Sequence, residues 1–234
     1  MTYCVAMRLD RGMIFVSDSR TNAGVDHISS FRKLQVFQTP GERTLVLQSA
    51  GNLATTQSVI SLLRRDCQDS EKPNLLNSAS LYDVVLLVGE TLREVIKRDG
   101  EEFSGTLLLG GQIRGEESRL FQIYPQGNFI EASVDTPYFQ IGESKYGKPI
   151  IDRVLRYDTP LEQAMQCALI SMDSTLASNI SVGLPLDVMI YHCDSFDDSR
   201  QYHITESHPY FSQIRQLWSR GLHSVFTQLP PLTL

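Results

Sequence analysis

Strand-like and helix-like segments of this chain come in blocks, and their order restricts the fold more than any other feature. Alternating apolar positions indicate the strands, and apolar residues three or four apart indicate the helices. In chain order, the segments are strands at Thr2–Arg8, Met13–Asp18, Leu34–Gln38 and Thr44–Ser49, helices around 53–63 and 81–95, strands at Gly105–Leu109, Leu120–Tyr124 and Asn128–Ala132, helices at Gly147–Leu155 and 161–172, a strand at Asp187–Cys193 and a C-terminal helix around Tyr210–Thr227.

This order argues against alternating βαβ units, which would build a parallel sheet. We predict an α+β fold, a four-layer αββα sandwich in which two antiparallel sheets lie between two helical layers. The C-terminal helix is expected to pack through Trp218, the only tryptophan. With 234 residues and neither an internal repeat nor a long linker, the chain is expected to form one domain, residues 1–234.

Charge and cysteine spacing narrow the class of protein. A net charge of −6 supplies no broad basic face, so neither nucleic acid nor a membrane surface is predicted as a partner. Arg8 and Asp10 interrupt the N-terminus before the apolar core of a signal peptide could form. The four cysteines are widely scattered, which is typical of reduced thiols in a cytoplasmic protein.

Common catalytic and cofactor motifs are absent from the sequence. There is no Gly-x-Ser-x-Gly elbow, no phosphate-binding loop and no His-Glu-x-x-His pair. The five histidines show no metal-ligand spacing, and the acidic cluster at 194–198 lacks the signature of a calcium loop. The sequence therefore predicts neither a metal nor a cofactor.

The N-terminus offers a different chemistry. Strand-like alternation begins at once after Thr2, so we expect the terminus to be held at a sheet edge. Methionine is usually trimmed when the next residue is small, and trimming of Met1 would leave Thr2 with a free α-amine beside its hydroxyl. A hydroxyl needs a base to become a nucleophile, and an α-amine, with a pKa of about 7.7–8.0, can serve as that base near neutral pH.

Two charged residues could complete such a site. Lys33 leads into the third strand and could stabilise the forming alkoxide, and Asp18, at the end of the second strand, could keep a buried lysine protonated. Each residue also has a plainer reading: an aspartate after a strand often caps a turn, and a lysine usually lies at the surface. The residues alone leave both readings open.

At these positions the sequence resembles the proteasome β-type N-terminal-nucleophile hydrolases. The opening MTYCVAM, the segment SDSRTNAGVDHIS and the tetrapeptide FRKL, with Ser49-Ala50-Gly51-Asn52 opening a helix, carry the resemblance. It covers essentially the whole chain and is closer still to the bacterial Anbu (ancestral β-subunit) and HslV-like members. The resemblance implies an αββα sandwich with Thr2 as nucleophile, Asp18 and Lys33 as its catalytic partners, and the Gly51 amide at the oxyanion hole.

Further residues are implied with less support from the motifs. Gly142-Glu143-Ser144 is similar to the segment that supplies an accessory serine, here Ser144. Asp173 and Ser178 are candidates for orienting the Thr2 amine, although the family's Asp-x-x-Ser-Gly pattern is not reproduced around them. Arg20, beside Asp18 in the same segment, is a further accessory candidate.

The resemblance implies a cytoplasmic threonine endopeptidase that acts on peptides or unfolded proteins. It implies self-assembly into a ring or split ring, dodecameric or larger, and an ATPase or other partner that would feed it unfolded substrates. Two alternatives remain open: an amidohydrolase of the same fold that acts on a small molecule, and a self-assembling structural protein with a weak or silent site.

Overall fold

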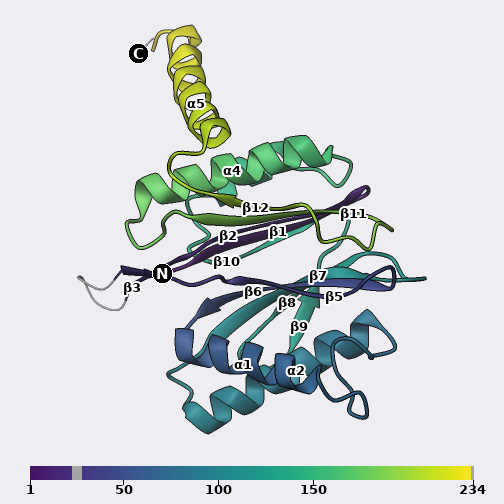
Figure 1. The fold of residues 1–234 in the computed structure, drawn as a ribbon. Helices are drawn as coiled ribbons and strands as arrows, with labels where there is room; N and C mark the ends of the chain where they lie inside the picture. Colours follow the sequence, from purple (N-terminus) through teal and green to yellow (C-terminus); the bar gives the residue numbers. More distant parts are fainter. Residues whose placement is uncertain (23–27, 233–234) are drawn as a thin grey trace.

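The computed structural model describes residues 1–22 and 28–232 of the chain. Two five-stranded antiparallel sheets face each other between two layers of helices (Figure 1). The first sheet, in the order β10-β1-β2-β11-β12, contains β1 (Tyr3–Leu9), β2 (Gly12–Asp18), β10 (Tyr138–Gly142), β11 (Leu186–His192) and β12 (Gln201–Ile204). The second sheet, in the order β5-β6-β7-β8-β9, contains β5 (Leu34–Thr39), β6 (Arg43–Gly51), β7 (Gly105–Ile113), β8 (Arg119–Ile123) and β9 (Phe129–Glu131).

Helices cover the outer face of each sheet, which confirms the predicted αββα sandwich. The helices are α1 (Leu53–Asp66) and α2 (Leu81–Asp99) on the second sheet, α3 (Lys148–Val154) and α4 (Leu161–Ser178) on the first, and α5 (Pro209–Gln228) beyond α4 (Figure 1). The side chains of Asn52 and Ser80 accept hydrogen bonds from backbone N–H groups in the first turns of α1 and α2. Such N-caps fix where a helix begins.

The side chains of β1 point alternately into two hydrophobic cores. Tyr3, Val5 and Met7 pack towards α4, whereas Cys4 and Ala6 face the second sheet. The cluster between the sheets also contains residues of β6, β7 and β8, so both sheets share it. Burial on both faces explains why nearly every side chain of this strand is apolar. On the ground of this shared core we propose that residues 1–234 form one domain.

The expectation that the N-terminus lies at a sheet edge is wrong. β1 pairs with β2 on one side and with β10 on the other, with Tyr3 opposite Gly142. The sequence reading missed β10 because it has only five residues, between Pro137 and the Gly142 turn. Strands β2 and β10 therefore hold β1, which begins next to Thr2, from both sides.

Three other short strands were also not predicted. Inside the polar segment 19–30, β3 (Arg20–Asn22) pairs with β4 (Ile28–Ser30), and β12 pairs with β11. Residues 23–27 of the quoted segment SDSRTNAGVDHIS, with His27, lie outside the described residues. No helix in the described part of the chain combines the length and apolar character needed to cross a membrane.

The C-terminal helix differs from the expectation. Phe211, in the first turn of α5, is its one buried residue, with 1% of its surface exposed. Trp218 is only half-buried and does not fasten the helix to the body. Beyond its first turns, α5 projects away from α4 (Figure 1).

Candidate active site

A cavity of about 550 Å³ lies at the N-terminal end of β1. Thr2, Arg20, Lys33 and Gly51 all line it, although they come from four separate segments of the sequence. Thr2 precedes β1, Arg20 begins β3, Lys33 precedes β5 and Gly51 ends β6. The packing of the two sheets therefore gathers these four predicted site residues around one space.

Lys33 is held beside the cavity by a buried ion pair. Its Nζ atom lies 2.7 Å from Oδ1 of Asp18, and the two side chains are 6% and 0% exposed. The same ammonium donates a second hydrogen bond of 2.7 Å to the backbone oxygen of Arg20. A buried lysine needs such partners to stay protonated, so this geometry keeps a positive charge at the cavity wall.

Asp18 links the ion pair to the N-terminal strand. Its Oδ1 also accepts a 3.0 Å hydrogen bond from the backbone N–H of Tyr3, the residue next to Thr2. Its Oδ2 accepts a longer one, 3.4 Å, from the N–H of Gly183. Burial raises the pKa of the Asp18 carboxyl above its ordinary value, and the Lys33 ammonium and these N–H groups oppose that rise.

Thr2 itself is positioned through its backbone. Its carbonyl oxygen accepts a 2.7 Å hydrogen bond from the N–H of Glu143, just beyond the end of β10. Gly142 has a φ of +82°, and a β-carbon added to it would come within 1.9 Å of the Thr2 oxygen. Only glycine allows this approach, so the turn after β10 fixes where Thr2 lies.

Gly51 occupies the turn from β6 into α1. Its φ is +119°, and a β-carbon there would lie 2.5 Å from the backbone oxygen of Ser104. The next residue, Asn52, caps α1. The N-terminus of a helix carries partial positive charge, so this end of the cavity favours a developing negative charge.

Arg20 braces the loop that follows α4. Its Nη1 atom donates a 3.0 Å hydrogen bond to the backbone oxygen of Ile180. A β-carbon on Gly183 would lie 2.0 Å from the Arg20 Nε, so the guanidinium rests directly against that glycine. The N–H of Gly183 also donates a hydrogen bond to Asp18, so Arg20 contacts the residue that supports the ion pair.

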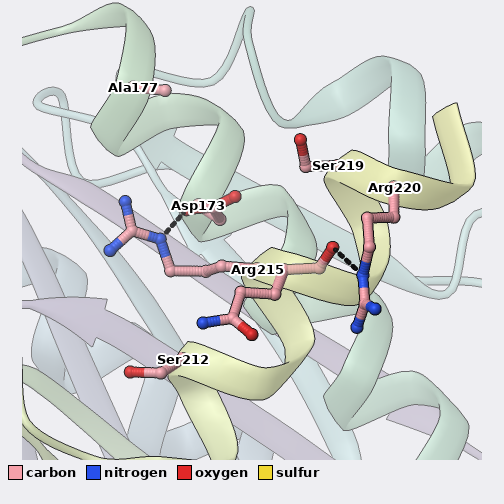
Figure 2. Close-up of a pocket in the computed structure, with 7 residues that line it drawn as sticks. Asp173, Ala177, Ser212, Arg215, Ser219 and Arg220 are labelled. Carbon is pink, nitrogen blue, oxygen red and sulfur yellow. Dashed lines mark hydrogen bonds and ion pairs between the residues drawn. The ribbon is translucent and has the colours of Figure 1, made fainter. Parts of the chain in front are cut away.

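The other accessory candidates lie outside the lining of this cavity, although Ser144 follows directly on Glu143, whose N–H bonds to the Thr2 carbonyl oxygen. Among the described residues, neither Ser144, Asp173 nor Ser178 lines the cavity that contains Thr2. Asp173 instead points from α4 towards α5, where its Oδ1 lies 2.6 Å from Nε of Arg215 (Figure 2). Ser178 is exposed at the last turn of α4. Within the described part of the chain, Asp173 and Ser178 therefore do not share this cavity with Thr2.

Two polar residues near Thr2 were missed by the sequence reading. Glu143 is 7% exposed, and its Oε2 accepts a 2.8 Å hydrogen bond from Nδ2 of Asn179. The pair joins the turn after β10 to the loop that contains Gly183. The sequence offered one signal, since Glu143 lies inside the quoted Gly142-Glu143-Ser144 segment, but nothing in it pointed to Asn179.

A buried thiol lies beside the ion pair. The Sγ of Cys4 donates a 3.7 Å hydrogen bond to the backbone oxygen of Ser49. Burial raises the pKa of the Cys4 thiol well above its usual range. The residue therefore stays a neutral thiol at physiological pH and offers no competing nucleophile.

Comparison with known proteins identifies the family to which the chain belongs. Residues 2–190 match the family model described as "Proteasome subunit". Anbu (ancestral beta-subunit) from Yersinia bercovieri is 73% identical, with 99% of this chain and 100% of that chain covered and a TM-score of 0.97. The chain belongs to the Anbu proteins of the proteasome family.

Other members of the proteasome family are similar over the same length. The chain is 56% identical to a Pseudomonas aeruginosa protein described as the helical assembly of the Anbu complex, with 99% and 98% coverage and a TM-score of 0.95. It is 48% identical to Anbu from Hyphomicrobium sp. strain MC1, with 99% and 100% coverage and a TM-score of 0.94. A comparison with curated proteins returned no match.

Proposed function

We propose that this protein is a threonine-type peptidase, with Thr2 as its N-terminal nucleophile once Met1 has been removed. The observation that carries the proposal is the shared cavity, in which Thr2 lies with Lys33, fixed on buried Asp18, and with Gly51. Met1 also lines this cavity and is 63% exposed, so an aminopeptidase can reach it. We further propose that the protein acts in the cytoplasm.

In the proposed reaction, Thr2 supplies both nucleophile and base. The α-amine accepts the hydroxyl proton as Oγ bonds to the substrate carbonyl carbon, and the Gly51 N–H donates to the oxyanion. The C–N bond then breaks, and the same proton passes to the leaving amine. Water attacks the resulting ester with the amine again as base, which releases the acid and restores Thr2.

Lys33 serves this reaction through its charge. An ammonium group near the α-amine disfavours a second positive charge, so it lowers the pKa of that amine and leaves more of it able to accept a proton. The same charge favours the alkoxide that develops on Thr2. Asp18 is a positioning residue, because its contacts are with Lys33 and the backbone of Tyr3.

The substrate is proposed to be a peptide or an unfolded protein. The cavity of about 550 Å³ can hold side chains next to a scissile bond but no folded domain. Because the similar Pseudomonas protein is described as a helical assembly, we propose that this chain also forms a homo-oligomer, as an open or closed ring. A partner such as an ATPase would then supply unfolded chains.

A second candidate function is a self-assembling protein with a weak or silent site. It is favoured by the position of Asp173 and Ser178, which leave the Thr2 amine without the support expected from them. A small-molecule amidohydrolase would use the same chemistry, and only its substrate would differ.

Covalent labelling separates these functions. The Met1-free protein is incubated with a peptide vinyl sulfone and its intact mass is measured. We expect one adduct on the wild type and none on Thr2→Ala. Thr21→Ala, the same change in another threonine that lines the cavity, is the control and should label as the wild type does. An adduct on Thr2→Ala would refute Thr2 as nucleophile, and no adduct on the wild type would favour the silent site.

A further inference from the structure

Within the part of the chain that the structure describes, the C-terminal helix α5 is attached to the body through its first turns. Phe211 is 1% exposed, and Ile214 packs partly buried against the core beneath α4. An ion pair between Arg215 and Asp173 also joins the first turns of α5 to α4 (Figure 2). A helix of 20 residues is about 30 Å long, so most of α5 extends beyond these contacts.

An apolar stripe runs along the whole of this helix and its C-cap. The α5 stripe consists of residues three or four positions apart, namely Phe211, Ile214, Trp218, Leu222, Val225 and Leu229. This spacing places them on one helical face. Its distal half is uncovered, because Leu222 is 43% exposed and Val225 and Leu229 are each 55% exposed.

The exposure of its apolar face distinguishes α5 from the other long helices. The apolar faces of α1, α2 and α4 are buried against the two sheets. In α5, Leu217 and Phe226 flank the stripe and are 53% and 71% exposed, which widens the patch. Contiguous exposed apolar surface of this kind marks an interaction site.

A glycine inside α5 supports a close approach at the same place. Gly221 lies next to Leu222 at the edge of the α5 stripe, and an added β-carbon would meet no atom within 4 Å. Glycine in the middle of a helix costs about 0.5–1 kcal/mol relative to alanine. No contact among the described residues offsets that cost, and the open space beside Gly221 leaves room for a second helix to approach closely.

A second copy of the chain fits this surface best. The groove between α4 and α5 in the same copy is mainly polar and charged, so it provides no apolar surface that could cover the stripe. The polar and charged residues that line it are Asp173, Ser212, Arg215, Gln216, Ser219 and Arg220 (Figure 2). The stripe itself carries no charge, so two stripes can meet without burying an unpaired ion. One contact related by a two-fold axis would cover both.

We infer that the α5 stripe packs against the α5 stripe of a second copy of this chain and joins the two copies within the homo-oligomer. The inference rests on the proposed self-assembly and assigns a specific contact to it. The contact is helix on helix, centred on Leu222 and Val225, with Gly221 allowing the two backbones to approach closely.

The test is the molar mass of the full chain in solution, measured by light scattering over a range of concentrations. We expect the wild type to exceed the monomer mass of 26.4 kDa. The double variant Leu222→Glu, Val225→Glu should lower the average mass by about twofold or more, since a two-fold contact joins two copies. Both positions are partly exposed, so folding should persist and is checked by circular dichroism.

Matched variants make the result specific. His223→Glu with Thr227→Glu adds the same number of acidic residues to the opposite, exposed face of α5 and should leave the mass unchanged. Gly221→Leu adds apolar surface and favours the helix, yet should also lower the mass because it blocks the close approach.

The outcomes separate the two proposals. A wild type that is monomeric at every concentration overturns the homo-oligomer and, with it, this contact. A wild-type oligomer whose mass is the same in the double variant, or is retained by Gly221→Leu, overturns the α5 contact alone. A mass lowered equally by the control pair would also overturn it.

Discussion

The Nζ atom of Lys33 and the Oδ1 atom of Asp18 lie 2.7 Å apart, and both side chains are almost fully withdrawn from solvent. The pair joins the start of β5, in the second sheet, to the end of β2, in the first. It therefore fixes a charge in the cavity at a point where the two sheets meet. The same carboxylate contacts the backbone beside Thr2, so the charge and the terminus are held together.

Removing one partner of this ion pair should lower the free energy of unfolding. Lys33→Met leaves the Asp18 carboxylate buried without its cation, and breaking a buried pair in this way costs about 3–5 kcal/mol of unfolding free energy. Denaturant unfolding of both proteins measures the loss. We also expect Lys33→Met to abolish vinyl sulfone labelling at neutral pH.

The double variant Lys33→Met, Asp18→Asn is the control for the ion pair. With no charge left unpaired, it should recover most of the lost stability and none of the labelling. A Lys33→Met protein as stable as the wild type would show that the pair does not hold the sheets together.

Gly142→Ala should move Thr2. The new β-carbon would overlap the Thr2 carbonyl oxygen, in addition to the strain of about 1–2 kcal/mol that a left-handed φ imposes on alanine. Gly115→Ala is matched, because Gly115 has a φ of +91° and an added β-carbon there meets nothing within 4 Å. We expect Gly142→Ala to lose more thermal stability than Gly115→Ala and to label at least tenfold more slowly. Equal labelling of the two variants would refute positioning by Gly142.

The thiols should react in two classes. Cys4 and Cys167 are buried, and burial raises the pKa of Cys167 to about 11 and that of Cys4 further, so neither forms thiolate at pH 8. Cys67 and Cys193 are partly exposed. Iodoacetamide followed by peptide mapping should modify only the latter two in the folded protein. Rapid alkylation of Cys4 would contradict the structure around the ion pair.

The rate at which the vinyl sulfone labels the protein should rise with pH. The Thr2 α-amine acts as base only when unprotonated, so the rate increases as pH passes upward through the pKa of that amine. The ordinary value is about 7.7–8.0, and the Lys33 ammonium should lower it. Adduct formation measured from about pH 5 to about pH 9, with Thr2→Ala as the blank, should show a midpoint below 7.7. A rate that does not change with pH would exclude the amine as base.

The layered fold, three residues that line the cavity and the buried Asp18 beside them could be predicted because each has a local signal. Blocks of alternating residues indicate strands in either sheet, and Thr2, Asp18, Lys33 and Gly51 each lie at the end of an element, where a motif can be read. The need of a buried lysine for a carboxylate made Asp18 and Lys33 a candidate pair, and the family resemblance favoured it over the plainer reading of each residue.

The residues behind the site could not be predicted in the same way. Asp173 looked suitable by residue type, but its partner is Arg215 on α5, and that contact depends on how α5 docks on α4. The contact between Glu143 and Asn179 joins residues 36 positions apart in sequence, and the strand that places Glu143 is too short to give a periodic signal. Such contacts arise from packing of the whole fold.

The proposed mechanism requires Thr2 to act with its own free amine. A peptide epoxyketone tests both groups at once, because it can close a ring on an adjacent hydroxyl and amine. The protein is incubated with the reagent, digested, and its N-terminal peptide is measured by mass spectrometry. We expect a peptide that begins at Thr2 and carries one reagent molecule. A peptide that still begins at Met1, or one that begins at Thr2 and stays unmodified, would contradict it.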